Sequence, residues 1–562
     1  MAAELVIRGG TVVDGTGSPG RRADVAVTGG RVTGVAEGLR GDRELDAGGC
    51  VVAPGFVDIH THYDAQVLWD PRLTPSCFHG VTTVVTGNCG FSLAPTRPAQ
   101  RGLLARTLEK VEDMAAAALA EGITWEFESH QEYLAAVGRR GSALNVTAFV
   151  GHTALRLFVL GDDAYERAAT PEEVATMGEV LRGGLVAGAA GFSSSFSATH
   201  LGAGSRPVPS RLADRGELLA LLGVLGEVGR GVFAVSPGTG CTVDDLYDWQ
   251  PGVGVPFTYG ALLSSPTGVH RERLAANRDG WARGAQVWPQ VTPRPATFVT
   301  SMAAPFTFNP NPAFGELGER TPEERRRAYA DPRWRERARS GWDAYRQGGQ
   351  QAILVPRWDA YQVATSTARP DLDGVAVAEA ARRLGVPPLD ALLDLALAEP
   401  DLALRVRCVF ANDDEEEVAA LLADDRCVLG LSDAGAHFDQ ICDAPQATDY
   451  LGNWVRDRGV VPLEEAVRRL TSLPAGLFGM VDRGVLRPGA WADVTVFDPA
   501  TVGPGPVRRV RDFPGGTERL TADRPDGVRH VLVNGVPIRT DAVQAPPEVR
   551  PGQVVALAAG GR

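Results

Sequence analysis

The segment APGFVDIHTHYD, residues 53–64, is the most informative part of the chain, because an apolar run ends there in His60 and His62. Residues two apart on a strand point to the same side, so both imidazoles can meet one metal ion. Two partly buried core histidines would show the same spacing. Here the pair closes a strand that leads into a long series of strand-and-helix units, which favours a metal site at the mouth of a barrel.

Strand-like sequence lies on both sides of this series. The first fifty residues contain ELVIRGGTVVDG, ADVAVTGGRVTGVA and RELDAGGCVVAPG, and the same style returns near the other end in WADVTVFDP and GVRHVLVNGVPI. Alternating β-branched residues between Gly and Asp turns are typical of short strands. Two such clusters can share one sandwich only if the chain leaves it and returns. We therefore predict a small discontinuous β-sandwich domain from residues 1–55 and 483–545.

Between the clusters, apolar runs alternate with helical stretches such as PEEVATMGEVLRGGLV. The runs are GVTTVVTGN, ALNVTAFVG, GAAGFSSS, GVFAVSPG, VPFTYGALL, AQVWPQVTP, RVRCVFAND and CVLGLSD. Repeated units of this kind predict an α/β fold, a TIM-like (β/α)8 barrel over residues 56–482. Residues 296–350 break the rhythm and are expected to form an insertion over the mouth, either a lid or a plain helical decoration.

Composition narrows the class of partner. A formal net charge of -13 argues against nucleic acid and membrane surfaces. The first residues lack the basic segment and long apolar run expected of a secretory signal peptide. A membrane-spanning helix needs about 18 consecutive apolar residues, and no stretch of the sequence approaches that length. The seven cysteines are scattered without CxxC spacing, as reduced thiols are. The expectation is a cytoplasmic protein.

Several segments carry a family resemblance. PGFVDIHTHYD resembles the first-strand metal motif of the amidohydrolase superfamily, and GVTTVVTGNCGFSLAP (80–95) resembles the second-strand segment of its N-acyl-D-amino-acid deacylase, or D-aminoacylase, branch. The likeness extends to VGHTALR (150–156), LSDAGAH (431–437) and LTSLPAGLFGMVDRGVLRPGAWADVTVFDP (470–499). It implies a metal at the C-terminal ends of the barrel strands and a small β-sandwich beside the barrel.

The resemblance implies roles for three further residues. Cys89 stands in the GNCG of the second-strand segment, where the deacylases carry a metal ligand, and a thiolate suits zinc; a buried inert thiol is the alternative. Asp433 matches the aspartate that ligates metal and takes the proton of the attacking water before passing it to the departing nitrogen. His437 either orients substrate or is a structural histidine.

The middle strands depart from the family pattern. The only lysine, Lys110, lies in a helical segment, which excludes a bridging carboxylated lysine. Ser236 stands on the fifth strand where deacylases usually carry a histidine, and the sixth strand has none. His152 and His200, after the third and fourth strands, remain as replacement ligands. The predicted ligands of one zinc ion, with a second left open, are His60, His62, Cys89, His200 and Asp433.

The expected activity is metal-dependent hydrolysis of a linear amide, most simply of an N-acyl-D-amino acid. Arg156 and Arg294 are the guanidinium groups proposed to hold a substrate carboxylate in a bidentate fork, with His152 and His437 as further contacts. A cyclic-amide hydrolase of the hydantoinase or dihydroorotase kind is a weaker alternative without the bridging lysine. A non-catalytic binding module is another, opposed by the four ligand-type residues at strand ends. The expected partner is a small-molecule amide, and a homo-oligomer is left open.

Overall fold

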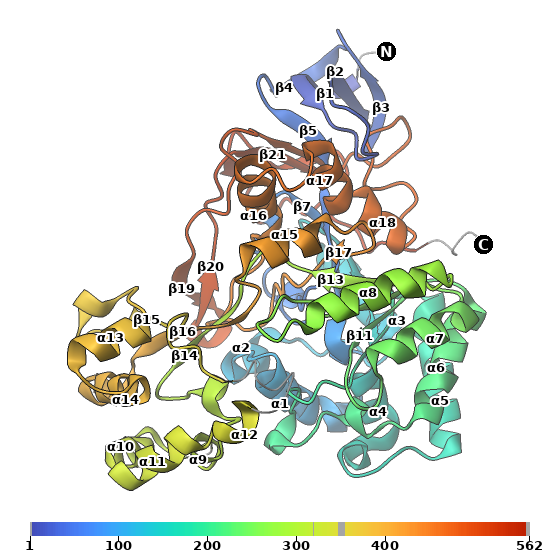
Figure 1. The fold of residues 1–562 in the computed structure, drawn as a ribbon. Coiled ribbons are helices and arrows are strands. Elements are labelled where there is room, and N and C mark those ends of the chain that lie inside the picture. The colour runs from blue at the N-terminus through green and yellow to red at the C-terminus, as the bar shows by residue number, and fades with distance from the viewer. Residues whose placement is uncertain (1–2, 319, 347–354, 558–562) are drawn as a thin grey trace.

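The computed structural model describes residues 3–318, 320–346 and 355–557, and its centre is the predicted barrel (Figure 1). Each strand pairs in parallel with the next, and a parallel bridge between Thr61 and Ala434 joins the last to the first. The strands in order are β6 (Phe56–Asp58), β7 (Val81–Thr86), β8 (Asn145–Ala148) continued by β9 (Val150–Gly151), β10 (Gly191–Ser195), β11 (Val232–Ser236), β12 (Phe257–Tyr259), β13 (Val287–Val291) and β17 (Val428–Leu429). The predicted fold class is confirmed.

Helices between the strands cover the outside of the barrel. They include α3 (His130–Arg140), α4 (His152–Leu160), α5 (Pro171–Val186), α6 (Arg215–Val228), α7 (Val243–Val253), α8 (Val269–Ala282), α15 (Glu415–Ala423), α17 (Leu463–Leu470) and α18 (Ser472–Leu477). α5 begins at a capping box of Thr170 and Glu173 with proline in its first turn. Every residue of β7, β10 and β11 is buried, as in parallel strands covered on both faces. No helix in the described ranges is long and apolar enough to cross a membrane.

A second sheet joins the two ends of the chain. Its described strands follow the order β23-β22-β21-β18-β5-β1-β2-β3, with β4 on β1. They are β1 (Ala3–Val12), β2 (Arg21–Thr28), β3 (Arg31–Ala36), β4 (Gly41–Asp46), β5 (Val51–Pro54), β18 (Val494–Phe497), β21 (Val528–Val533), β22 (Val536–Thr540) and β23 (Val543–Gln544). β5 pairs antiparallel with β18 and leads directly into β6, so this sheet anchors the first barrel strand. The residue limits of the two domains stay a prediction.

The insertion after β13 is larger than the sequence indicates. β14 (Ala296–Ser301), β15 (Gln362–Thr365) and β16 (Arg405–Ala411) form an antiparallel sheet, with α9 (Pro312–Gly315), α10 (Pro322–Ala330), α11 (Pro332–Ser340), α12 (Asp343–Arg346), α13 (Val377–Leu384) and α14 (Pro388–Ala398). It has its own apolar core from Met302 to Cys408 and stands to one side of the barrel (Figure 1). The assignment of RVRCVFAND to the barrel was wrong, because this run is β16 and pairs with β14. A lid role stays a prediction.

Candidate metal centre

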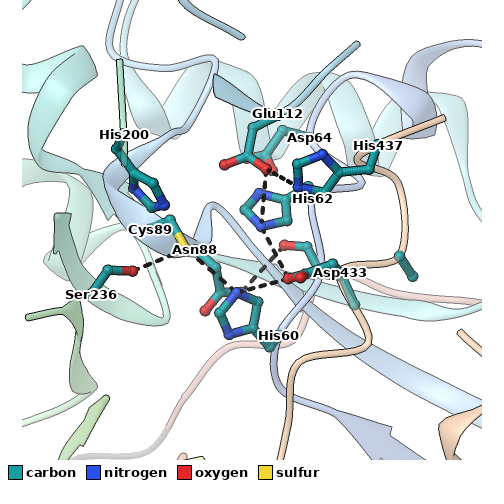
Figure 2. Close-up of polar contacts among 12 residues, drawn as sticks. His60, His62, Asp64, Asn88, Cys89, Glu112, His200, Ser236, Asp433 and His437 are labelled. Carbon is teal, nitrogen blue, oxygen red and sulfur yellow. Dashed lines mark hydrogen bonds and ion pairs between the residues drawn. The ribbon is translucent and has the colours of Figure 1, made fainter. Parts of the chain in front are cut away.

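Four predicted ligands meet at the C-terminal ends of three barrel strands (Figure 2). His60 and His62 follow β6, Cys89 lies in η3 (Asn88–Gly90) after β7, and Asp433 follows β17. The ligand atoms of His60, His62 and Cys89 all lie within 4.8 Å of one another.

The distances fit a shared ion. His60 Nε2 lies 3.5 Å from Cys89 Sγ and 3.2 Å from Asp433 Oδ1, and His62 Nε2 lies 3.6 Å from the same Oδ1. Ligand atoms around a tetrahedral zinc, with bonds of about 2.0–2.3 Å, stand roughly 3.3–3.8 Å apart. The two imidazoles are almost completely buried, which removes competing water from the site. Nitrogen, sulfur and carboxylate donors in this arrangement suit zinc.

A neighbouring amide orients His60. Its Nδ1 lies 2.5 Å from Gln290 Oε1 on β13, while Gln290 Nε2 donates to Thr258 Oγ1 at 3.2 Å. Because an amide oxygen can only accept, Nδ1 carries a proton, and in the neutral, metal-binding form of the ring the lone pair of Nε2 would face the cluster. Such outer partners commonly fix the tautomer of a metal-binding histidine.

The charges of the cluster favour metal binding. Burial alone would raise the pKa of the Cys89 thiol, but His60 and His62 outweigh it and lower that pKa to about 6. Burial likewise opposes ionisation of Asp433, yet the same two imidazoles hold its pKa well below the usual range. Burial lowers the pKa of His60, but Cys89 and Asp433 outweigh it and raise that pKa to about 9, so without a metal the thiolate and the carboxylate lie beside imidazolium groups. Zinc, which also carries positive charge, would take the place of the imidazolium protons.

The backbone at the site is held in an uncommon conformation. Cys89, Asp433 and His437 have φ values of 55°, 44° and 49°, in the left-handed region that residues with a Cβ seldom adopt. Such strain costs about 1–3 kcal/mol per residue and gathers at functional sites. Gly435, with φ 95°, lies so close to His62 that a Cβ would stand 2.7 Å from the backbone of that residue. Tight packing of these loops positions the ligands.

His200 lies beside this group. Its Nδ1 is 2.7 Å from Ser195 Oγ, and its ring packs 5.5 Å from the ring of Phe91. Figure 2 shows the imidazole on the Cys89 side of the cluster. It is not one of the residues whose ligand atoms lie within 4.8 Å of one another, so a direct role in the shell stays a prediction.

His152 and Arg156, two of the expected substrate contacts, instead bind other side chains of the protein. His152 lies 2.8 Å from both Ser194 Oγ and a carboxylate oxygen of Glu217, and Arg156 pairs with the other oxygen of Glu217. The side chains of His152 and Arg156 on α4 and of Glu217 on α6 are all buried. The expectation that His152 and Arg156 contact substrate is corrected, because a buried guanidinium needs its carboxylate partner.

Loss of this buried pair should be costly. Glu217→Gln would leave the charge of Arg156 without a counterion, so we expect the free energy of unfolding to fall by about 3–5 kcal/mol. Chemical denaturation followed by circular dichroism measures the change. Glu227→Gln is the matched control on the same helix, since Glu227 is 65% exposed and pairs with Arg182 at the surface; its effect should stay below about 1 kcal/mol. Equal losses in both variants would contradict the assignment.

Arg294 is also paired. Its Nε donates to Asp443 at 2.6 Å, and its guanidinium lies 4.0 Å from Asp449. Asp443 occupies Nε of this guanidinium, and the expected role of Arg294 in holding a substrate carboxylate stays a prediction. His437, the remaining expected contact, lies at the centre, with its ring 5.4 Å from that of Phe298 on β14. The insertion thus reaches the edge of the site.

Sequence reasoning missed Glu112, and it named Ser236 at the position of the absent fifth-strand histidine without giving it a contact. Glu112 follows α1 (Arg101–Val111), and its Oε2 lies 3.6 Å from His62 Nε2. Ser236 Oγ donates to Cys89 Sγ at 3.4 Å, and Gly260 comes so close that a Cβ would stand 3.3 Å from the ring of His60. The helical segment around Glu112 shows no local signal, because its proximity to His62 arises only on folding.

Known proteins resemble the chain along most of its length. The family model described as "Amidohydrolase family" matches residues 43–240 and 361–539. An N-acyl-D-glutamate deacylase of Alcaligenes xylosoxydans xylosoxydans is 31% identical, covering 98% of this chain and 96% of that protein. A D-aminoacylase of the same organism is 30% identical, with coverage of 95% and 94%.

Solved structures agree. An N-acyl-D-glutamate deacylase from Bordetella bronchiseptica, complexed with zinc and a phosphonate inhibitor, has a TM-score of 0.66 at 29% identity and covers 99% of this chain and 100% of that one. A D-aminoacylase described as defining a novel subset of amidohydrolases has a TM-score of 0.64 at 26% identity, with coverage of 98% and 99%. The chain therefore belongs to the amidohydrolase family.

Proposed function

We propose that this chain hydrolyses the linear amide bond of N-acyl-D-amino acids with a zinc ion held by His60, His62, Cys89 and Asp433. The observation that carries the proposal is the convergence of these four side chains at the strand ends, where barrel enzymes place their chemistry. The similar N-acyl-D-glutamate deacylase structure holds zinc and a mimic of the tetrahedral intermediate, which supports the same chemistry here.

Each group of the proposed site has a separate role in the hydrolysis. Bound zinc supplies a Lewis acid for the amide carbonyl and lowers the pKa of a water molecule. A carboxylate oxygen of Asp433 takes the proton of the attacking water and then delivers it to the departing nitrogen. Gln290 keeps His60 in the tautomer that presents Nε2, so the ligand need not reorganise. The products are a free carboxylic acid and a free D-amino acid.

A substrate panel tests the reaction class. The zinc-loaded enzyme is offered N-acetyl-D-amino acids, their L-enantiomers and a hydantoin. Release of free amine is measured for the linear substrates, and formation of the ring-opened N-carbamoyl amino acid is measured for the hydantoin. We expect turnover of linear D-substrates and none of the cyclic amide. Ring opening of the hydantoin alone would favour the cyclic-amide alternative. No turnover of any compound by protein with bound zinc would favour the binding module.

Arg211 is our candidate for the group that holds the substrate carboxylate. It lies in η7 (Pro209–Leu212), and its guanidinium donates to the carbonyl oxygens of Ala198 and His200, each at 3.2 Å. Over the described ranges it forms no ion pair, unlike Arg156 and Arg294. His200 lies on the Cys89 side of the cluster, and the hydrogen bond to its carbonyl oxygen keeps the Arg211 guanidinium next to this loop, which supports a role in binding a carboxylate.

Substitution of Arg211 should weaken the binding of substrate. A hydrogen bond between charged groups contributes about 1.5–3 kcal/mol, so Arg211→Ala is expected to raise the KM for an N-acetyl-D-amino acid by about 10- to 100-fold while kcat changes less. Steady-state kinetics measure both constants. Arg215→Ala, which removes an exposed arginine paired with Asp245, is the control and should leave KM unchanged. An unchanged KM in Arg211→Ala would refute the assignment.

For the compartment we propose the cytoplasm and, as partner, a small-molecule amide. The seven cysteines are all free, as a reducing compartment permits. Cell fractionation with detection of the protein tests the proposal, and recovery of the protein from the periplasmic or secreted fraction would overturn it.

A further inference from the structure

We propose that Glu112 is a further ligand of the zinc ion, a carboxylate supplied from the end of α1 in place of the histidines absent from the fifth and sixth strands. The inference rests on the proposed zinc centre and adds to it a residue outside the motifs of the barrel strands. The geometry of the carboxylate, the cost of burying it and the lack of ligands on the middle strands each support it.

Glu112 is fixed against the centre by both its backbone and its side chain. Its carbonyl oxygen accepts the backbone N–H of His437 at 2.6 Å, which ties the end of α1 to the loop that carries Asp433. Its Oε2 lies 3.6 Å from His62 Nε2 and 3.8 Å from His437 Nε2. Figure 2 shows the carboxylate pointing at His62 from the side opposite His60.

These distances suit a shared ion better than a hydrogen bond. At 3.6 Å, the oxygen and the nitrogen are too far apart to share a proton directly. Two ligand atoms at this separation can both lie about 2.0–2.2 Å from one zinc ion. Asp433 Oδ1, a ligand in the proposed centre, also stands 3.6 Å from His62 Nε2. Glu112 therefore meets His62 at the same separation as a residue already placed in the shell.

The surroundings of Glu112 make an unpaired charge there costly. The side chain is 5% exposed, and its ion-pair contacts in the described part of the chain are the imidazoles of His62 and His437, both beyond hydrogen-bond distance. It lies at the C-terminal end of α1, where the helix dipole disfavours negative charge. Asp433 and the thiolate of Cys89 are close by. Buried charges persist when they are paired or coordinate a metal, and a cation in this centre would supply the partner.

The middle strands leave coordination positions open. Ser236 offers only a hydroxyl, which donates to Cys89, and Gly260 offers no side chain next to His60. The Glu112 carboxylate, by contrast, lies within 3.8 Å of both His62 Nε2 and His437 Nε2. A carboxylate from the end of α1 would be the fifth protein ligand beside His60, His62, Cys89 and Asp433, and would take the shell from tetrahedral to the five-coordinate geometry that zinc can also adopt.

Metal affinity and spectroscopy test the proposal. Wild type, Glu112→Gln and Glu112→Asp are stripped with a chelator, and zinc affinity is measured by competition with a chromophoric chelator. We expect the zinc Kd of Glu112→Gln to rise by about 10- to 100-fold, the range for lost metal-site partners. The visible bands of the Co²⁺-substituted protein should shift, because they report the ligand set. The zinc Kd of Glu112→Asp should lie between the values for wild type and Glu112→Gln. Glu121→Gln, the same change at an exposed site on α2 (Ala116–Gly122), should match wild type.

The stability of the metal-free protein separates a ligand from a structural residue. Metal-free Glu112→Gln should be at least as stable as wild type, because a costly buried charge is gone, while the gain in Tm on adding zinc should shrink. A variant with the zinc Kd and Co²⁺ spectrum of wild type would overturn the inference and leave the proposed function standing. Wild-type protein that binds no zinc would instead overturn the zinc centre itself.

Discussion

Asp433→Asn should lower kcat/KM for an N-acyl-D-amino acid by at least about 10³-fold, the largest effect of any single isosteric change in the site. Removal of general acid–base transfer alone costs about 10²–10⁴-fold, and the substitution also weakens a metal ligand. Asparagine keeps the shape of the side chain but cannot accept a proton from the attacking water. Steady-state amine release at saturating zinc, with bound metal quantified in the same sample, measures the loss.

The metal measurement divides the two contributions. If Asp433→Asn retains zinc but not turnover, proton transfer accounts for the loss, and if zinc is also lost, ligation contributes. Asp439→Asn is the control in the same loop, since Asp439 is partly exposed and pairs with Arg405 and Arg509. Activity of Asp433→Asn within tenfold of wild type would exclude Asp433 as the proton shuttle.

Removal of the metal is the second large effect. Stripping with a chelator should reduce amine release by about 10³-fold or more, because the several kcal/mol of carbonyl polarisation and water activation disappear together, and each 1.36 kcal/mol is tenfold in rate. Re-addition of zinc should restore activity in wild type. In Cys89→Ala the restoration should fail or require far more zinc, since the thiolate lies 3.5 Å from His60 Nε2 within the ligand group.

A second cysteine provides the matched comparison. Cys241 is buried and free in another part of the barrel, so Cys241→Ala should strip and reload like wild type despite a small loss of stability. Zinc content is read by elemental analysis at each step. Full activity in the stripped wild type, or normal reloading of Cys89→Ala, would contradict the proposed zinc centre.

The candidate ligand residues that the sequence could identify are those that stand at the ends of its own strands. His60 and His62 follow β6 on either side of Thr61, whose parallel bridge to Ala434 continues the extended chain, and Cys89 follows an unbroken β-branched run. The side-chain chemistry and the strand-end position of such residues are both local properties, and parallel barrel strands bring their C-terminal ends to one face. The alternation of strands and helices likewise predicted the barrel before any contact was known.

Partners from distant segments were decided only by the tertiary structure. RVRCVFAND has the composition of a barrel strand, yet it became β16 because β14 and β15 pair with it, and periodicity does not reveal the pairing partner.

Long-range contacts also decided the surroundings of the two arginines and of Glu112. Arg156 and Arg294 carry the charge to bind a substrate carboxylate, but folding brings Glu217 and Asp443 against them. Folding also carries Glu112 to within 3.6 Å of His62 from a helix with no motif. The amino-acid sequence alone determined the fold class and which strand ends bear side chains of the types that can bind a metal. Long-range contacts decided which polar groups remain available to bind substrate or metal. The reason is that a charge is neutralised by the groups that the folded chain places beside it.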